Sequence, residues 1–330
     1  MEKMEEDERK KEEELEKKHG KKYKKKKKKK KDDGPMETVI LEQTIVKIGA
    51  LLALGFGEAG SKIIATNMEN SGDVDPMIPG VKCISIFGFC DIRNFTDSTE
   101  QLQEGVMLFV NEIGELVHSV CDHYSGAANK NVGDAFLLVW RFEEEEDFTV
   151  NEETEDLTIK DSRKVRQIAD MTIVCFTKII TEIRRSKKLR KYRDYGPLLE
   201  RMPNYEVKMG FGLHVGWAIE GAIGSFYKID ASYLSPNVEL TIKLEGATKA
   251  FGVPILLSGE LKAICSKEAD SLMRHVDSVK FVSNGVTCHI YTIDLDPNTI
   301  DTDFGQVSHT RKQAKLRRVK AKLNRQRYRD

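Results

Sequence analysis

The sequence lacks a net charge, because its 330 residues carry 53 basic and 53 acidic side chains. It also lacks a CxxC pair: its six cysteines are scattered, which argues against a zinc site or a disulfide framework and for thiols in a reducing compartment. The N-terminus has no apolar core of the kind found in secretory signals. No uninterrupted apolar run reaches the roughly 18–20 residues of a membrane helix. We therefore expect a cytoplasmic protein without a membrane span.

The balanced total conceals a separation of charge along the chain. Residues 1–33 have a net charge of +5 and include eight consecutive lysines, Lys24–Lys31, while residues 311–330 have a net charge of +9 and the rest of the chain −14. Like charges at this density favour solvated tails. Alternatively, Lys24–Lys31 and the basic amphipathic stretch 311–330 bind an acidic surface, such as a membrane or a microtubule of the cytoskeleton or cilium. We expect no specific recognition of nucleic acid.

Composition divides the chain into four parts. Residues 1–33 form a low-complexity charged tail, residues 34–79 a helical lead-in, residues 80–296 the main domain and residues 297–330 a basic tail. Within the lead-in, apolar residues at helical intervals predict a helix over residues 37–70. Turn-forming residues then separate this helix from the main domain.

The main domain alternates strands and helices. Apolar runs predict strands at residues 81–89, 135–142 and 207–221, and shorter strands in GVPILLS and HIYTIDLD. Helical spacing predicts helices over residues 99–124, 163–190 and 236–250. The order predicts an α/β (α+β) fold with a ferredoxin-like or palm β-α-β-β-α-β core and added helices.

The lead-in contains GFGEAG, in which Gly55, Gly57 and Gly60 fit the G-x-G-x-x-G pattern of dinucleotide-binding sites. That site requires a strand before the glycines and a helix after them. Because the preceding residues favour a helix, we interpret these glycines as small residues for close helix packing.

Two carboxylates occur where strands meet turns. Asp91 follows the predicted strand 81–89, and Asp134 lies at the tip of a predicted hairpin. A single Asp in a turn usually forms an Asx-turn or a helix cap. Two of them on adjacent strands instead favour a site for hard divalent cations, and the amides between Ile92 and Thr96 are placed to bind phosphate.

These segments resemble the catalytic domain of class III adenylate and guanylate cyclases over residues 80–296. The resemblance is carried by IFGFCDIRNFTDSTE, NKNVGDAFLLVW, GLHVGWAIEGAIGS, YLSPNVELTIKLEGATKAFG and IYTID, in that order. It implies conversion of a nucleoside triphosphate to a 3′,5′-cyclic nucleotide and pyrophosphate with two Mg²⁺ or Mn²⁺ ions. It also implies a site at a dimer interface, formed by a homodimer or by a heterodimer with another cyclase domain.

The resemblance assigns roles to individual residues. Asp91, Ile92 and Asp134 fall on the metal-binding positions. Phe95 and Thr96 fall in the segment that contacts the triphosphate. Lys130 and Ser232 fall on the base-reading positions, where Lys favours ATP over GTP and a Ser hydroxyl can accept a hydrogen bond from the adenine amino group.

The sequence departs from the family at the positions that stabilise the transition state. The family has Asn and, four residues later, Arg, whereas this chain has Glu239 and Lys243. Glu239 adds negative charge, Lys243 lacks the bidentate fork of Arg, and their spacing allows them to pair with each other. A lysine that holds the terminal phosphates aligns with Val282.

Three functions fit these observations. The chain is either the metal-donating half of an adenylate cyclase that needs a complementary partner, or an inactive pseudo-cyclase that acts as a dimerisation or scaffold module on an acidic structure, or a weakly active homodimer. Losing one preorganised transition-state donor typically costs about 10²–10³ in rate, so we expect little activity from the chain alone.

Overall fold

The computed structural model describes residues 37–71, 75, 77–143, 146–150, 157–280, 287–296 and 299–300. The basic stretches 1–33 and 311–330 and the position Val282 lie outside these residues. The described chain divides into two compact units between Gly55 and Phe56. Helix α2 (Glu37–Ser71) includes this boundary, and its helical geometry is interrupted at Gly57, which has a φ of 68°.

The apolar character of α2 differs from expectation. The stretch Val39–Gly57 is 19 residues long with a mean hydropathy of 1.7, which by length and composition is enough to cross a membrane. The search for apolar runs missed this stretch because Glu42 and Lys47 interrupt it without lowering its mean hydropathy very far.

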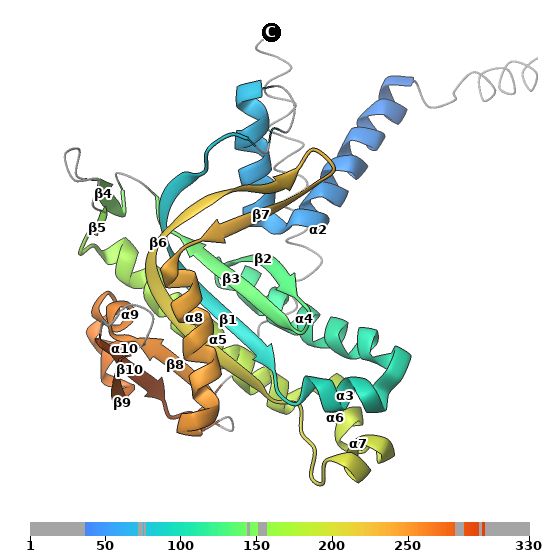
Figure 1. The fold of residues 1–330 in the computed structure, drawn as a ribbon, viewed down its shortest axis with the longest axis vertical. Helices are drawn as coiled ribbons and strands as arrows, with labels where there is room; N and C mark the ends of the chain where they lie inside the picture. The colour runs from blue at the N-terminus through green and yellow to red at the C-terminus, as the bar shows by residue number, and fades with distance from the viewer. Residues whose placement is uncertain are drawn as a thin grey trace, which may run out of the picture. The chain divides into compact units, whose positions relative to one another are not determined.

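The second unit is built around a mixed sheet with the strand order β2-β3-β1-β6-β8-β10-β9, and β7 pairs with β6 (Figure 1). Its strands are β1 (Val81–Ile92), β2 (Ala127–Val132), β3 (Ala135–Arg141), β6 (Met209–Ser225), β7 (Lys228–Leu234), β8 (Ile255–Ser258), β9 (Met273–Lys280) and β10 (Thr287–Ile293). A separate small ladder joins β4 (Phe148–Val150) to β5 (Leu157–Ile159).

The predicted β-α-β-β-α-β core is present. Strand β1 pairs antiparallel with both β3 and β6, and β2 pairs with β3, so the core strands lie in the order β2-β3-β1-β6. The helices are α3 (Phe95–Leu102), η1 (Gln103–Gly105), α4 (Val106–His123), α5 (Arg163–Arg185), α6 (Lys187–Arg193), α7 (Gly196–Arg201), α8 (Pro236–Phe251), α9 (Gly259–Ala263) and α10 (Lys267–Ser271).

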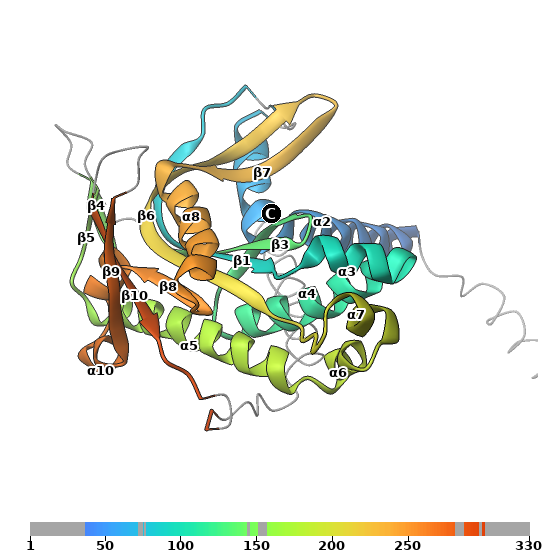
Figure 2. The same ribbon diagram turned by 60° about the horizontal axis from the view of Figure 1, so that its bottom comes forward.

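The two faces of the sheet have different covers. Figure 2 shows α4 and α5 on one face and α8 on the other. Because side chains alternate along a strand, Ile86 and Leu138 point into the larger core beneath α4 and α5. Their neighbours Phe87 and Leu137 point to the α8 face, where they form a smaller cluster with Ile63 of α2.

Local sequence explains why α8 begins and ends where it does. The Ser235 hydroxyl accepts a hydrogen bond from the Asn237 amide at 3.0 Å, and Pro236 occupies the first turn, where its missing N–H costs nothing. Gly252 ends the helix in the left-handed conformation with a φ of 63°. The helix therefore matches the predicted range 236–250 almost residue for residue.

Two predicted helices are broken in the structure. The range 99–124 is divided near Gln103, whose φ is +51°, and the range 163–190 is divided at Ser186, which caps α6 by accepting a hydrogen bond from Leu189 N at 3.3 Å. Apolar periodicity continues across both breaks because the same core lies beneath each pair of helices, so periodicity alone did not reveal them.

Candidate active site

Asp91 lies inside β1, one residue before its end, whereas the sequence placed it after the strand. It faces Ala135 of β3 and Gly210 of β6 in the ladder. Asp134 occupies the two-residue turn that joins β2 to β3, next to Gly133, whose φ of +64° suits glycine. The Asp91–Ala135 register therefore brings the two carboxylates together at one edge of the sheet.

The two carboxylates interact electrostatically. The pKa of Asp91 is raised from 3.8 to about 6, first by burial and then by the negative charges of Asp134 and Glu245, while Lys249 opposes the rise. A raised pKa of this kind is typical of carboxylates gathered at a functional site without a counter-ion. This edge of the sheet is thus prepared for a cation.

A buried ion pair connects β1 to α8 beside this edge. Arg93, two residues after Asp91, lies with its Nη1 2.7 Å from Glu245 Oε1, and the two side chains are only 15% and 6% exposed. Arg93 also donates to the Thr248 hydroxyl, and its amide donates to Lys208 O at 2.9 Å. The pair occupies space that glycine leaves open, because a Cβ at Gly210 would collide with both side chains.

The first turn of α3 follows directly. Phe95 packs against the main core, whereas Thr96 is exposed. Asn94, in a left-handed conformation with a φ of 57°, precedes the helix and makes no side-chain capping hydrogen bond. The helix thus presents backbone amides that its own cap does not occupy, which is the geometry that binds anions.

Lys130 and Ser232, distant in sequence, lie in contact. The Lys130 ammonium donates to the Ser232 hydroxyl at 3.3 Å. The side-chain Nδ2 of the adjacent Asn129 donates to the Ala231 backbone carbonyl at 3.2 Å. The chain thus brings its two predicted base-reading residues together, on β2 and β7. Their role in reading a base stays a prediction.

Glu239 and Lys243 lie on the outer surface of α8. Their side chains are 71% and 38% exposed, with Lys243 Nζ 3.9 Å from Glu239 Oε2, which is the pair that their spacing predicts. The buried residues of α8 are Val238, Thr241, Leu244, Glu245 and Thr248. Glu239 is thus largely open to solvent and Lys243 is half-buried, and neither is among the buried residues of α8.

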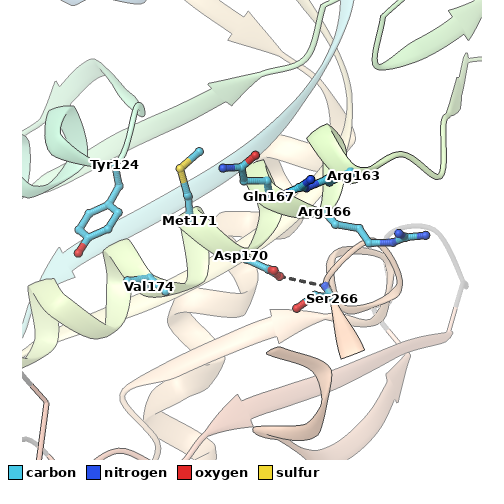
Figure 3. Close-up of a pocket in the computed structure, with 8 residues that line it drawn as sticks. All are labelled: Tyr124, Arg163, Arg166, Gln167, Asp170, Met171, Val174 and Ser266. Atoms are coloured by element: carbon cyan, nitrogen blue, oxygen red, sulfur yellow. Dashed lines mark hydrogen bonds between the residues drawn. The ribbon is translucent and has the colours of Figure 1, made fainter. Parts of the chain in front are cut away.

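The site residues do not coincide with the pocket shown in Figure 3. That hollow of about 420 Å³ is lined mainly by α5, with Tyr124 and Ser266 at its sides, and Asp170 accepts a hydrogen bond from Ser266 N at 2.9 Å. None of its lining residues is a predicted site residue. A site shared between two chains does not need a deep pocket in either one.

The donor set fits a hard divalent cation. Two carboxylates at a strand edge, one with a raised pKa, match Mg²⁺ or Mn²⁺, which bind few protein oxygens and complete their shell with water and phosphate. Among the described residues, no group of three or more His, Cys, Asp or Glu is arranged to hold a metal. Asp91, Asp134 and the backbone carbonyl of Ile92 would therefore hold the ion together with substrate oxygens.

Sequence reasoning missed Arg93, Glu245, Thr248 and Lys249. The available signals were an arginine two residues after the candidate metal ligand and a glutamate on the opposite side of α8 from Glu239. Neither signal shows that Arg93 pairs with Glu245, because these two residues are 152 positions apart in the sequence.

Comparisons with known proteins identify the family and the fold. Residues 78–292 match the adenylate and guanylate cyclase catalytic domain, and residues 1–69 match the RasGEFs all helical domain, of which the structure describes only part of α2. An adenylate cyclase of Anabaena cylindrica is 22% identical over 62% of this chain and 36% of its own length. Adenylate cyclase 1 of Rhizobium meliloti (strain 1021) is 23% identical over 54% of this chain and 23% of its own. The chain thus covers about a third of the length of the Anabaena cylindrica relative and about a quarter of the length of the Rhizobium meliloti relative.

Solved structures show the same fold. A bacterial light-regulated adenylyl cyclase aligns with a TM-score of 0.56 and 20% identity over 80% of this chain and 67% of its own. The adenylyl cyclase CyaB from P. aeruginosa aligns with a TM-score of 0.50 and 16% identity over 68% of this chain and 100% of its own. Since the family match covers well over half of the residues, the chain belongs to the class III adenylate and guanylate cyclase catalytic domain family.

Proposed function

We propose that this cyclase domain converts ATP to cyclic AMP and pyrophosphate as the metal-donating half of a site completed by a second cyclase domain. One observation carries the proposal: Asp91 and Asp134 are brought together at a sheet edge, whereas Glu239 and Lys243 stand exposed on α8 and pair with each other. This chain thus keeps the two metal-binding carboxylates of a cyclase site, whereas the residues at its transition-state positions are altered.

The reaction needs the ribose 3′-oxygen to bond to the α-phosphorus. The bond from that phosphorus to the α,β-bridging oxygen breaks, pyrophosphate leaves, and the hydroxyl proton passes to solvent. Two Mg²⁺ or Mn²⁺ ions at Asp91, Ile92 and Asp134 would lower the pKa of the hydroxyl and neutralise the phosphates. The amides at the start of α3, near Phe95 and Thr96, orient the triphosphate.

The contact between Lys130 and Ser232 supports adenine as the base that this chain reads, in the composite site whose metal carboxylates come from the other subunit. The lysine donates to a ring nitrogen, and the serine hydroxyl accepts from the exocyclic amino group. Both curated relatives are named adenylate cyclases, which supports the same substrate.

The requirement for a partner follows from charge. In a dimer of identical chains, Glu239 would add a negative charge near the triphosphate, and Lys243 would provide one point charge where a planar fork is needed. A partner with Asn and Arg at these positions removes both defects, so we propose a heterodimer in preference to a homodimer.

A cyclic AMP assay tests the proposal. The full chain is incubated with ATP and Mn²⁺ or Mg²⁺, alone and mixed with candidate cyclase domains that carry the Asn and Arg. We expect activity only in a mixture, abolished by Asp91→Ala in this chain and unaffected by the same change in the partner. A mixture whose activity survives Asp91→Ala refutes the proposed role.

A second candidate is a pseudo-cyclase that scaffolds without turnover. The Glu239–Lys243 pair favours it, because the two residues at the altered transition-state positions lie beside each other in the free chain. This candidate predicts ATP binding without product. Turnover that is lost with Asp134→Ala would exclude it.

The two basic ends are proposed to place the protein on an acidic surface in the cytoplasm, such as a membrane or cytoskeletal structure. Binding through lysine clusters weakens with salt, since charges separated by more than about 8 Å are screened at physiological ionic strength. Vesicles containing phosphatidylserine and polymerised microtubules should retain the full chain at low salt and lose it when residues 1–33 and 311–330 are removed. Equal retention without them would refute this placement.

A further inference from the structure

The glycines of GFGEAG have a structural use that the dinucleotide pattern does not explain. Gly57 has a φ of +68°, and a Cβ there would lie 2.2 Å from the carbonyl oxygen of Ala128. A Cβ at Gly60 would lie 3.0 Å from the Cβ of Ala231. At Gly55 an added Cβ would meet no described atom within 4 Å. Two of the three glycines thus allow α2 to approach β2 and β7 closely.

The two strands that the glycines touch carry the predicted base-reading residues. Ala128 lies two residues before Lys130, and the β2 ladder shifts register between them, while Ala231 directly precedes Ser232. In the described chain β2 pairs with β3 and β7 pairs with β6, so no ladder joins β2 to β7. The strands are joined by the hydrogen bonds Asn129–Ala231 and Lys130–Ser232. Their separation is therefore sensitive to what packs against both.

The part of α2 that follows Gly60 is anchored to the main unit. Ile63 is 8% exposed and belongs to the cluster that contains Phe87, Leu137 and Ala231. Near the end of the helix, Asn67 both donates to and accepts from the backbone of Asp75 at 2.8 Å. Because the helix after Gly57 is anchored in this way, we expect extra volume at Gly57 to be relieved by movement of β2, in addition to the backbone strain that a φ of +68° imposes on any L residue.

We propose that Gly57 and Gly60 are positioning residues for nucleotide selection, because they set the distance between β2 and β7 and therefore the placement of Lys130 and Ser232 on the purine edge. The inference rests on the base-reading role proposed for these two side chains, which act in the composite site whose metal carboxylates come from the other subunit, or from a second copy of this chain. A shift of β2 by about 1 Å, which is what relief of a 2.2 Å contact requires, takes a 3.3 Å hydrogen bond beyond its useful range.

The test measures binding of ATP and of GTP to the full chain by isothermal titration calorimetry, in excess Mg²⁺. Gly57→Ala is expected to weaken ATP binding about tenfold and to bring the ATP-to-GTP affinity ratio towards one. Gly55→Ala, the matched control on the same helix, should change neither by more than about twofold. A folded Gly57→Ala variant with the wild-type affinity ratio overturns the inference.

Gly60→Ala gives a second measurement if Gly57→Ala fails to fold. Its 3.0 Å contact needs a movement of only a few tenths of an ångström, so we expect a loss of ATP affinity of about threefold with an unchanged melting temperature. An unchanged affinity for Gly60→Ala also overturns the inference.

Lys130→Ala separates this inference from the proposed function. If Lys130→Ala weakens ATP binding and neither glycine variant does, the positioning role alone is wrong. If wild-type protein binds neither nucleotide, or Lys130→Ala has no effect, base reading by this chain is wrong and the positioning role fails with it.

Discussion

Replacing Asp91 by Asn should stabilise the metal-free protein. Burial and the neighbouring charges of Asp134 and Glu245 raise the pKa of Asp91 from 3.8 to about 6, which means that the native state holds its carboxylate at a cost when the group is ionised. Asn keeps the shape and removes the charge. The same change should abolish stabilisation by Mg²⁺, because it removes a proposed ligand.

The size of the effect follows from the pKa. One pKa unit corresponds to about 1.4 kcal/mol, so a rise from 3.8 to about 6 corresponds to roughly 3 kcal/mol. Because the side chain is only half-buried, solvent screening reduces this to about 1–2 kcal/mol. For a domain of this size each kcal/mol moves the melting temperature by about 2–4 °C.

The sign with pH is fixed by linkage. The native carboxyl takes up its proton as pH falls through about 6, whereas the unfolded one does so near 3.8. The cost of ionisation is therefore fully present above about pH 6 and disappears as pH falls towards 3.8. The advantage of Asp91→Asn should be largest at pH 7.5 and nearly absent at pH 4.

Thermal unfolding in EDTA, followed by circular dichroism at both pH values, measures this difference. Asp194→Asn, which changes an exposed carboxylate at the end of α6, is the matched control. A repeat in excess Mg²⁺ should raise the melting temperature of the wild type and leave Asp91→Asn where it was. A variant that is less stable than wild type at pH 7.5 in EDTA, or equally stabilised at both pH values, would refute the reasoning.

Three further changes test other parts of the structure. Arg93→Met should lower the free energy of unfolding by about 3–5 kcal/mol, because it leaves Glu245 buried without its partner, and adding Glu245→Leu should recover much of this in a denaturant titration; equal losses for the single and double variants would contradict it. Glu239→Asn with Lys243→Arg should raise cyclic AMP formation by the chain alone by about 10², and no increase would place the defect elsewhere. Burial lowers the pKa of His214 from its ordinary value of 6.5. As pH falls below about 6.5, the unfolded chain therefore takes up a proton that the native chain does not, and the native state loses stability. The melting temperature of wild type should fall more steeply below that pH than that of His214→Gln, and equal slopes for the two proteins would contradict this.

The order of the core elements was predictable from sequence because each element has a strong local signal. Strand β3 is a run of apolar side chains, and α8 carries a serine cap, a first-turn proline and a terminal glycine. Strand β9 has no such signal: its sequence MRHVDSVK is largely polar and most of it is exposed. It forms by pairing with β10, an interaction that no local pattern reveals.

In the candidate site, too, some residues could be predicted from the sequence and others could not. Asp91 and Asp134 were identifiable as candidates because a carboxylate beside an apolar strand is unusual, and the antiparallel pairing of β1 with β3 then brings them together. The Arg93–Glu245 pair was not identifiable, because its meaning depends on the packing of α8 against β6 at Gly210 and Gly212. Long-range packing places these side chains, and the local sequence does not encode it.

The Arg93–Glu245 pair has a mechanical consequence for a dimer with shared sites. In the proposed dimer, Asp91 would belong to one composite site, and Glu239 and Lys243 of the same chain would belong to the other. Arg93 ties the strand end that carries Asp91 to the inner face of α8 at Glu245 and Thr248. In such a dimer, a displacement of α8 at one site would reach the metal-binding edge of the other through Arg93 and Glu245, and the two sites would be coupled.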